Sequence, residues 1–249
     1  PGAVISACLS FETPFQNQEG LAKRQAQLEG WGVKVTRFFD EAVADCDAIM
    51  LEINDPAYHA EYFARVAGLG KPVFVDKPMA GTVADGQRML ELAARHGTQV
   101  MSCSSLRFAT SLADALGLVP DPRLVNCYGA MGIAPAGDSL VWYGVHAFEM
   151  LHLALGGRAS QVSAIEVGSA IVSAVEYPDG RQGLVECRPG SYVYGGRLQG
   201  KDRVQPFLVD SRYTYRDLLR SVIRFFNGAA PAATLQDAFE ILELMQASR

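Results

Sequence analysis

The feature that most constrains this chain is a regular alternation of strand-like and helix-like segments over its first hundred residues. The short apolar runs of strand length lie at residues 3–9, 33–38, 48–53, 72–75 and 99–103. The segments with helical periodicity lie between them, at residues 21–30, 56–69 and 82–96. Such an alternation is typical of a parallel sheet with helices on both faces. We therefore predict a doubly wound α/β domain over residues 1–106.

The pattern changes after residue 106, where strand-like runs follow one another without crossover helices between most of them. These runs lie at residues 124–133, 162–167, 170–177, 182–187, 191–199 and 204–209. Turns rather than helices join them, as in the hairpin signal at residues 177–180 (YPDG). We predict an α+β domain with a largely antiparallel open sheet over residues 107–249. Helices are expected at residues 112–116, 141–155, 215–226 and 235–246.

A sheet with few helices leaves one face bare, and such a face usually finds a partner. The apolar and aromatic side chains expected on this face are Leu184, Tyr192, Tyr194 and Leu198. We therefore expect a homodimer or a homotetramer.

Composition narrows the functional classes further. The chain has 249 residues, 49% of them hydrophobic and 20% charged, and its 22 basic residues are outnumbered by 27 acidic ones, which argues against nucleic-acid binding. It has no apolar run of membrane-spanning length and no basic stretch typical of a signal peptide at residues 1–10, so we expect a cytoplasmic protein that does not bind membranes. Its five cysteines are widely spaced, which predicts small buried side chains and neither disulfides nor a metal site.

Two motifs carry a resemblance to a known family. Residues 48–107 run as strand, helix, strand, Asp76-Lys77-Pro78, helix and strand, and YGVHAFE follows at residues 143–149. This order resembles the glucose–fructose oxidoreductase/inositol dehydrogenase (Gfo/Idh/MocA) family, whose members carry Glu-Lys-Pro and Gly-x-His-x-x-Asp at the corresponding places. The resemblance implies a Rossmann-like domain that binds NAD or NADP. It also implies hydride transfer between the nicotinamide and a polyol or sugar-like substrate.

Lys77 and His146 are the predicted catalytic residues. Lys77 follows an apolar strand, at the edge of the sheet where ligands of open α/β folds bind, and its ammonium group could polarise a substrate oxygen. A lysine lying along a strand end is the alternative. The resemblance implies that His146 accepts the proton of the substrate hydroxyl, although a histidine in so apolar a helix is often a core residue. Glu149, three residues further on, could bind one imidazole nitrogen and leave the other free as a base.

The remaining site residues are predicted to bind the substrate or the cofactor. The predicted substrate-binding residues are Arg107, Tyr143 and Glu149, and the predicted cofactor-binding residues are Ser10, Asn54, His59, Asp76 and Lys77. For Arg107, an interdomain salt bridge is an equally good interpretation. His152 is six residues from His146 and points elsewhere around the helix, so we expect no metal site there.

Two departures from the family pattern leave alternatives open. No GxGxxG turn exists in these 249 residues, so the Rossmann-like domain is predicted to be truncated at its N-terminus, with Ser10 and Glu12 as the nearest polar candidates for a ribose contact. Either the chain is part of a longer gene product, the alternative that we favour, or it is a natural variant that has lost cofactor binding. The second departure is Trp142, which stands where many members carry an aspartate. The alternative function is therefore a non-catalytic homologue that acts as a binding or scaffolding subunit.

Overall fold

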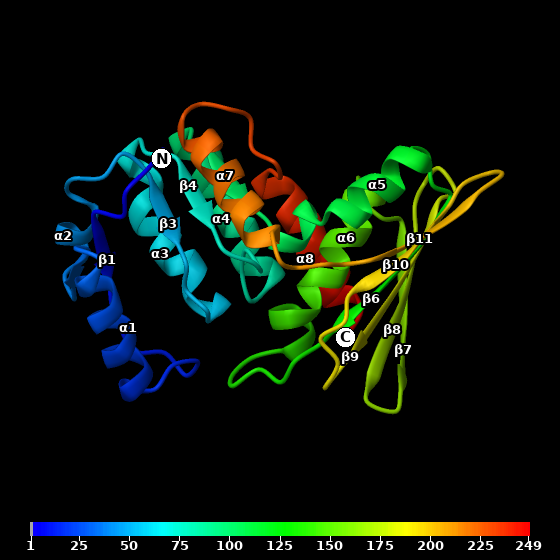
Figure 1. Cartoon of the computed structure of the whole chain (residues 1–249), viewed down its shortest axis with the longest axis horizontal. Coiled ribbons are helices and arrows are strands. Elements are labelled where there is room, and N and C mark those ends of the chain that lie inside the picture. Colours follow the sequence, from blue (N-terminus) through cyan, green and yellow to red (C-terminus); the bar gives the residue numbers. More distant parts are fainter. Residues whose placement is uncertain (1) are drawn as a thin grey trace.

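A computed structural model describes residues 2–249, and its N-terminal part alternates strands with helices (Figure 1). The parallel strands are β1 (Ala7–Leu9) and β2 (Lys34–Thr36), which pair with each other, and β3 (Ile49–Leu51), β4 (Val73–Val75) and β5 (Val100–Ser102), which pair in that order. The helices between them are α1 (Gln18–Gly30), α2 (Phe39–Val43), α3 (His59–Val66) and α4 (Val83–His96). The predicted Rossmann-like class is confirmed. The single predicted sheet is instead two parallel groups of strands, and each strand is shorter than its apolar run.

Local chemistry explains where the elements around β4 begin and end. All three residues of β4 are buried, because β3 and β5 flank the strand and helices cover its faces. The Thr82 side chain accepts the Asp85 backbone N–H and starts α4, while Gly97 ends the helix in the left-handed region with φ of 65°. The segment between β4 and α4 is thus fixed at both ends, and it carries Asp76 and Lys77.

The second part of the chain is a six-stranded sheet in the order β11-β10-β6-β9-β8-β7, in which only β6 and β9 pair in parallel. Its strands are β6 (Leu124–Ala130), β7 (Gln161–Val167), β8 (Ala170–Glu176), β9 (Gln182–Arg188), β10 (Gly195–Gln199) and β11 (Val204–Leu208). The helices α5 (Thr110–Leu118) and α6 (Val145–Leu155) lie against one face (Figure 1). Gly183 permits this close approach, because a Cβ there would stand 2.7 Å from Leu151 Cδ1 of α6. The predicted α+β class is confirmed.

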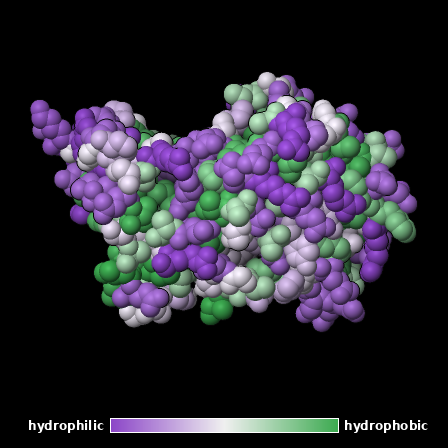
Figure 2. All heavy atoms as spheres, turned by 180° about the vertical axis from the view of Figure 1, so that it is seen from behind, coloured by the Kyte–Doolittle hydropathy of each residue, from purple (hydrophilic) through white to green (hydrophobic). Residues whose placement is uncertain are grey.

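The other face of this sheet carries no helix, and it mixes apolar with polar side chains. Ile165 and Leu208 are 64% and 61% exposed. Seen from behind, the molecule as a whole shows hydrophobic residues in separate patches among hydrophilic ones (Figure 2). Leu184 lies on this face, but the placement of Leu198 there is wrong, since it is fully buried opposite Val125 on the helix-covered side.

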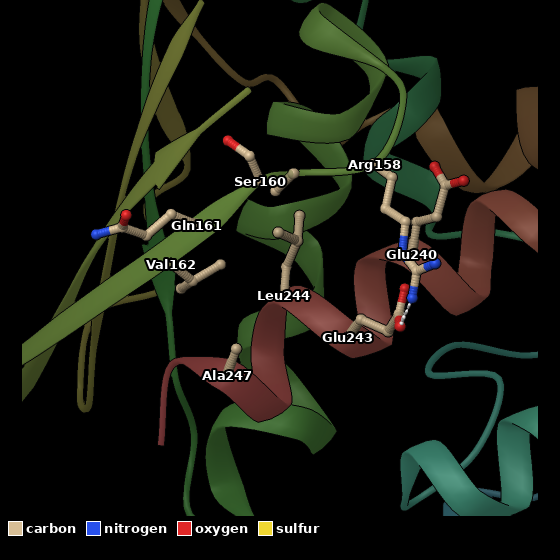
Figure 3. Close-up of a pocket in the computed structure, with 9 residues that line it drawn as sticks. Arg158, Ser160, Gln161, Val162, Glu240, Glu243, Leu244 and Ala247 are labelled. Atoms are coloured by element: carbon tan, nitrogen blue, oxygen red, sulfur yellow. Dashed lines mark hydrogen bonds and ion pairs between the residues drawn. The ribbon is translucent and has the colours of Figure 1, made fainter. Parts of the chain in front are cut away.

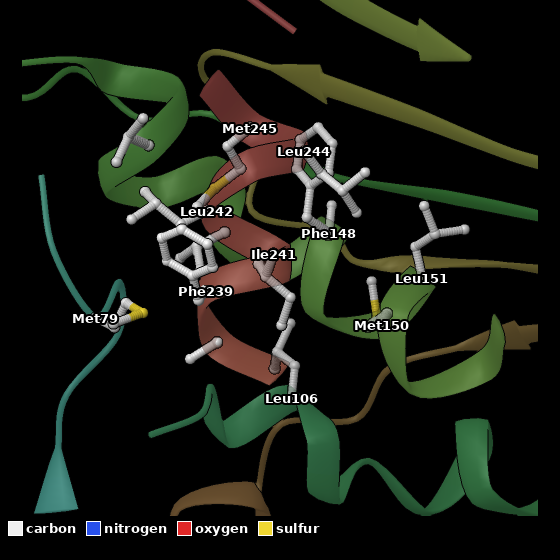
Figure 4. Close-up of a cluster of buried hydrophobic side chains, with 14 of the residues drawn as sticks. Met79, Leu106, Phe148, Met150, Leu151, Phe239, Ile241, Leu242, Leu244 and Met245 are labelled. Carbon is white, nitrogen blue, oxygen red and sulfur yellow. The ribbon is translucent and has the colours of Figure 1, made fainter. Parts of the chain in front are cut away.

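Two C-terminal helices return to the first part of the chain. In α7 (Thr214–Phe226), Leu218 and Val222 pack with Phe74 and Met101 of β4 and β5. The helix α8 (Leu235–Ala247) begins with a capping box and packs against α4 and α6. Figure 4 shows its apolar side chains between Met79 and the α6 side chains. The two parts therefore share a continuous core, and the boundary at residue 106 stays a prediction.

No helix in residues 2–249 combines the length and the apolar character needed to cross a bilayer.

Candidate active site

Lys77 lies at the carboxyl end of β4, half-buried. The backbone N–H of Asp76 donates to the Leu51 carbonyl oxygen at 2.9 Å, which holds the end of β4 against the end of β3. From this position the Lys77 Nζ lies 5.5 Å from the centroid of the Tyr143 ring, which comes from the second part of the chain. The lysine therefore points across the junction between the two parts, as the catalytic hypothesis requires.

His146 approaches the same ring from the other side of this junction. It is the second residue of α6, which continues from a π-helical turn at Leu140–Gly144. Its ring centroid lies 5.1 Å from that of Tyr143 and 5.7 Å from that of Tyr194. The structure therefore brings Lys77 and His146 together around Tyr143, although the sequence places them far apart.

Burial and charge keep the His146 imidazole neutral. The residue is 6% exposed, and this burial, with a smaller contribution from the positive charge of Lys77, lowers the pKa of His146 to about 3. Its Nδ1 lies 2.7 Å from the Ser104 Oγ. Nε2 has no hydrogen-bond partner among residues 2–249, so it is the nitrogen available to a ligand.

Arg107 and Glu149, both predicted to bind substrate, form an interior ion pair. The Arg107 Nη1 lies 2.9 Å from a Glu149 carboxylate oxygen, and the side chains are only 12% and 2% exposed. The Arg107 Nε also donates to the Ala232 carbonyl oxygen at 3.0 Å. The salt-bridge interpretation of Arg107 is thus the one that the structure supports. The hydrogen bond expected from Glu149 to His146 does not form, because the Glu149 side chain points from α6 toward Arg107 while the imidazole turns toward Ser104.

The predicted cofactor residues divide into two groups. Ser10, Asn54 and Asp76 lie beyond the carboxyl ends of β1, β3 and β4, respectively, and none of them is fully buried. His59, in contrast, is fully buried, and its two ring nitrogens lie 2.7–3.2 Å from the carbonyl oxygens of Ile53, Pro78 and Met79. The prediction that His59 binds the cofactor is wrong, because both ring nitrogens of this buried side chain contact backbone carbonyl oxygens, including those of the two residues that follow Lys77.

Aromatic side chains surround the Lys77–His146 pair, and the sequence pattern did not identify most of them as site residues. Trp142 packs against Tyr143 with ring centroids 5.2 Å apart, and its indole N–H donates to the Asn54 Oδ1 at 3.3 Å. The Tyr192 ring also packs against Tyr143. Both Tyr192 and Tyr194 were expected on the open face of the sheet. Both precede β10, where the chain turns back toward α6, and only the sheet register could have revealed this placement.

A separate cavity of about 260 Å³ lies between the start of β7 and α8, away from Lys77 and His146 (Figure 3). An ion pair between Arg158 and Glu243 crosses its edge. Near it, His152 Nε2 lies 3.0 Å from Glu240 Oε2, so this histidine points away from His146, in accord with the six-residue spacing.

Comparisons with known proteins agree with this geometry. Residues 17–103, which include Lys77 and the predicted cofactor residues from Asn54 to Asp76, match an oxidoreductase family with an NAD-binding Rossmann fold, Gfo/Idh/MocA. The family resemblance is confirmed. His146 and the aromatic side chains lie outside the matched segment, so the family match does not bear on them directly.

Solved structures extend the likeness of fold beyond residues 17–103. A scyllo-inositol dehydrogenase from Lactobacillus casei is 15% identical, with a TM-score of 0.80 over 97% of this chain and 86% of that one. A putative myo-inositol dehydrogenase from Sinorhizobium meliloti 1021 is 18% identical, with a TM-score of 0.76 over 91% and 85%. GenD2 from gentamicin A biosynthesis, solved with NAD, is 19% identical, with a TM-score of 0.76 over 90% and 81%.

Proposed function

We propose that this protein is an oxidoreductase that transfers a hydride between a nicotinamide cofactor, NAD or NADP, and a CH–OH group of a polyol or sugar-like substrate. One observation carries the proposal: Lys77 and His146, from two different parts of the chain, both lie beside the Tyr143 ring. A cation and a neutral imidazole that converge on one point can bind a single hydroxyl group.

Each residue has a distinct role in the oxidation of the substrate. The Lys77 ammonium group donates a hydrogen bond to the reacting oxygen and stabilises the negative charge that develops on it. His146 Nε2 accepts the hydroxyl proton, and the Tyr143 ring lies beside both side chains. The cofactor, when bound, supplies the hydride acceptor.

The residues described here fit a nicotinamide cofactor in part. Ser10, Asn54 and Asp76 offer polar side chains at the carboxyl ends of parallel strands, the edge where ligands of such sheets bind. Because residues 2–249 contain no GxGxxG turn, we assign no group to the pyrophosphate. Support for this cofactor comes from the match to an NAD-binding family and from relatives of the same fold that were solved with NAD(H).

The alternative, a non-catalytic homologue, depends on Trp142 standing where many members have an aspartate. This alternative loses weight because His146 has a different hydrogen-bond partner in Ser104. We further propose a cytoplasmic protein that assembles as a homodimer or homotetramer through the bare sheet face, on which Ile165 and Leu208 are exposed.

Cofactor titration and turnover test the proposed function. NAD and NADP are titrated by nicotinamide fluorescence, and a panel of inositols and aldoses is assayed for nicotinamide reduction. Lys77→Ala and His146→Ala are expected to lower turnover by roughly 10²–10⁴-fold with cofactor affinity nearly unchanged. Lys201→Ala and His96→Ala, exposed residues away from the site, serve as matched controls. Failure to bind either nucleotide, or normal turnover by the His146 variant, would contradict the proposal and favour the scaffolding alternative.

A further inference from the structure

Ser104 occupies a position between the two parts of the chain that the proposed chemistry has not yet used. It lies two residues beyond the end of β5 and caps the short turn at Ser105–Phe108. The residue is fully buried, and its Oγ lies 2.7 Å from the His146 Nδ1. The same oxygen accepts the Leu106 backbone N–H at 3.0 Å. The hydrogen bond from Leu106 therefore fixes the position of the serine hydroxyl beside the imidazole.

The surroundings hold Ser104 in place from a second direction. Its backbone carbonyl oxygen accepts the Arg107 backbone N–H at 3.2 Å, and the Arg107 side chain is paired with Glu149. Arg107 is in turn bound to the Ala232 carbonyl oxygen, in the segment before α8. A continuous chain of hydrogen bonds thus links the C-terminal segment, through Arg107 and Ser104, to the Nδ1 of His146.

We propose that Ser104 is the positioning residue of His146: its Oγ accepts the Nδ1–H, so that the neutral imidazole presents an unprotonated Nε2 to the substrate. This inference rests on the proposed function. A hydroxyl oxygen has two acceptor sites, and the Leu106 N–H occupies only one of them. The other site is free for Nδ1–H, and this tautomer is the one that a general base at Nε2 requires.

The identity of the partner also determines how His146 titrates. An uncharged serine gives the imidazolium no counter-charge, unlike a carboxylate. The charged or titratable groups that face the ring or lie beside its helix are Lys77, Tyr143, Tyr194 and the paired Arg107 and Glu149. Of these, Lys77 opposes protonation, and the charge of Glu149 is matched by Arg107. A carboxylate at position 104 would therefore change the titration of His146 far more than a hydroxyl does.

Nitrogen NMR of the imidazole rings provides a readout that does not depend on turnover. The chain has four histidines, so ¹⁵N-labelled imidazole spectra are simple, and His146→Gln assigns the His146 signals. In the unaltered protein we expect a protonated Nδ1 and an unprotonated Nε2. Ser104→Ala should shift the ring toward the opposite tautomer and lower kcat/KM by roughly 3- to 10-fold, the equivalent of one hydrogen bond. Ser104→Thr, which keeps the hydroxyl, should restore both properties.

Two further variants complete the test. Ser104→Asp should raise the pKa of His146 from about 3 by roughly 1 to 3 pH units, because it places an opposite charge beside the ring. Ser102→Ala removes a buried hydroxyl of β5 that has no partner among residues 2–249, so it should change neither the tautomer nor kcat/KM. An Nε2–H tautomer in the unaltered protein, or an unchanged spectrum in Ser104→Ala, would overturn the inference. If the tautomer responds as expected but no substrate is oxidised, the positioning stands and the proposed function fails.

Discussion

Replacing Arg107 by methionine should distinguish a structural ion pair from a substrate-binding arginine. Methionine keeps much of the length and apolar stem of arginine but removes the guanidinium group. The Glu149 carboxylate, whose side chain is only 2% exposed, then loses its charged partner, and the Ala232 carbonyl loses a donor. The destabilisation therefore comes mainly from the buried charge that is left behind.

The expected magnitude follows from this burial. Removing one partner of a buried ion pair costs about 3–5 kcal/mol of unfolding free energy. For a chain of this size, each kcal/mol lowers Tm by about 2–4 °C, so the melting temperature should fall by roughly 6–20 °C. The partial exposure of Arg107, at 12%, places the expected value toward the lower end.

The pH dependence of this loss carries a definite sign. Burial raises the pKa of Glu149, and the nearby Arg107 opposes that rise, so removing Arg107 should raise the pKa further. Between the unfolded and folded pKa values of this carboxyl, the folded state binds more protons, and unfolding free energy falls as pH rises. The loss of unfolding free energy in Arg107→Met, relative to the unaltered protein, should therefore be smallest near pH 4. Above that pH it should grow by up to about 1.4 kcal/mol per pH unit.

Urea denaturation at several pH values measures this deficit, with the enzyme assayed in parallel. Arg123→Met, which breaks an exposed ion pair with Asp121, is the matched control and should leave Tm nearly unchanged. If Arg107→Met is as stable as that control but raises KM, then Arg107 binds substrate and the structural assignment is refuted.

Four other changes follow from the structure. Because the His146 imidazole protonates only near pH 3, kcat/KM for oxidation should show no acid limb of its own between pH 5 and 7, and an inflection near 6.5 would contradict its burial. His59→Leu should lower Tm without changing cofactor affinity, as calorimetry can show. Gly183→Val should destabilise by about 1–3 kcal/mol in urea, since its side chain meets Leu151. Ile165→Lys should shift the oligomer toward monomer in light scattering, and an unchanged mass would refute assembly through that face.

The order of the elements could be predicted from the sequence, whereas side-chain placement across the sheets could not. The alternation of apolar runs identifies every strand of the first part and every α-helix except the short α2. It overestimates strand length, as in β1, because apolar residues such as Val4 and Ile5 remain exposed beside it. The alternation of side chains along a strand predicts that Leu184 and Leu198 each point to one face of the sheet, but it does not tell which face. That choice depends on the strand register, which is set by pairing between strands that are distant in sequence.

The candidate site shows the same division. Lys77 and His146 stand in recognisable motifs, so local pattern was enough to select them. Ser104 lies 42 residues from His146, and no local pattern marks it. Glu149 was expected to bind His146 from its helical spacing, yet the nearer and charged Arg107 takes this carboxylate. Pairing between distant residues decides such cases, because a buried charge is stabilised most by an opposite charge.

The charges around His146 also explain why an uncharged partner suits this site. Burial, with a smaller contribution from the positive charge of Lys77, lowers the pKa of His146 and makes it a weak base in the absence of substrate. During oxidation, however, the substrate oxygen acquires negative charge between the two groups, and this charge attracts both Lys77 and the forming imidazolium. In the proposed reaction, the basicity of His146 thus increases as the hydroxyl proton is transferred, and the charge on the oxygen is lost again when the hydride leaves and a neutral carbonyl forms. A permanent carboxylate at position 104 would stabilise the imidazolium before any substrate binds. It would therefore stabilise the resting protein as well as the transition state, and would not lower the barrier between them.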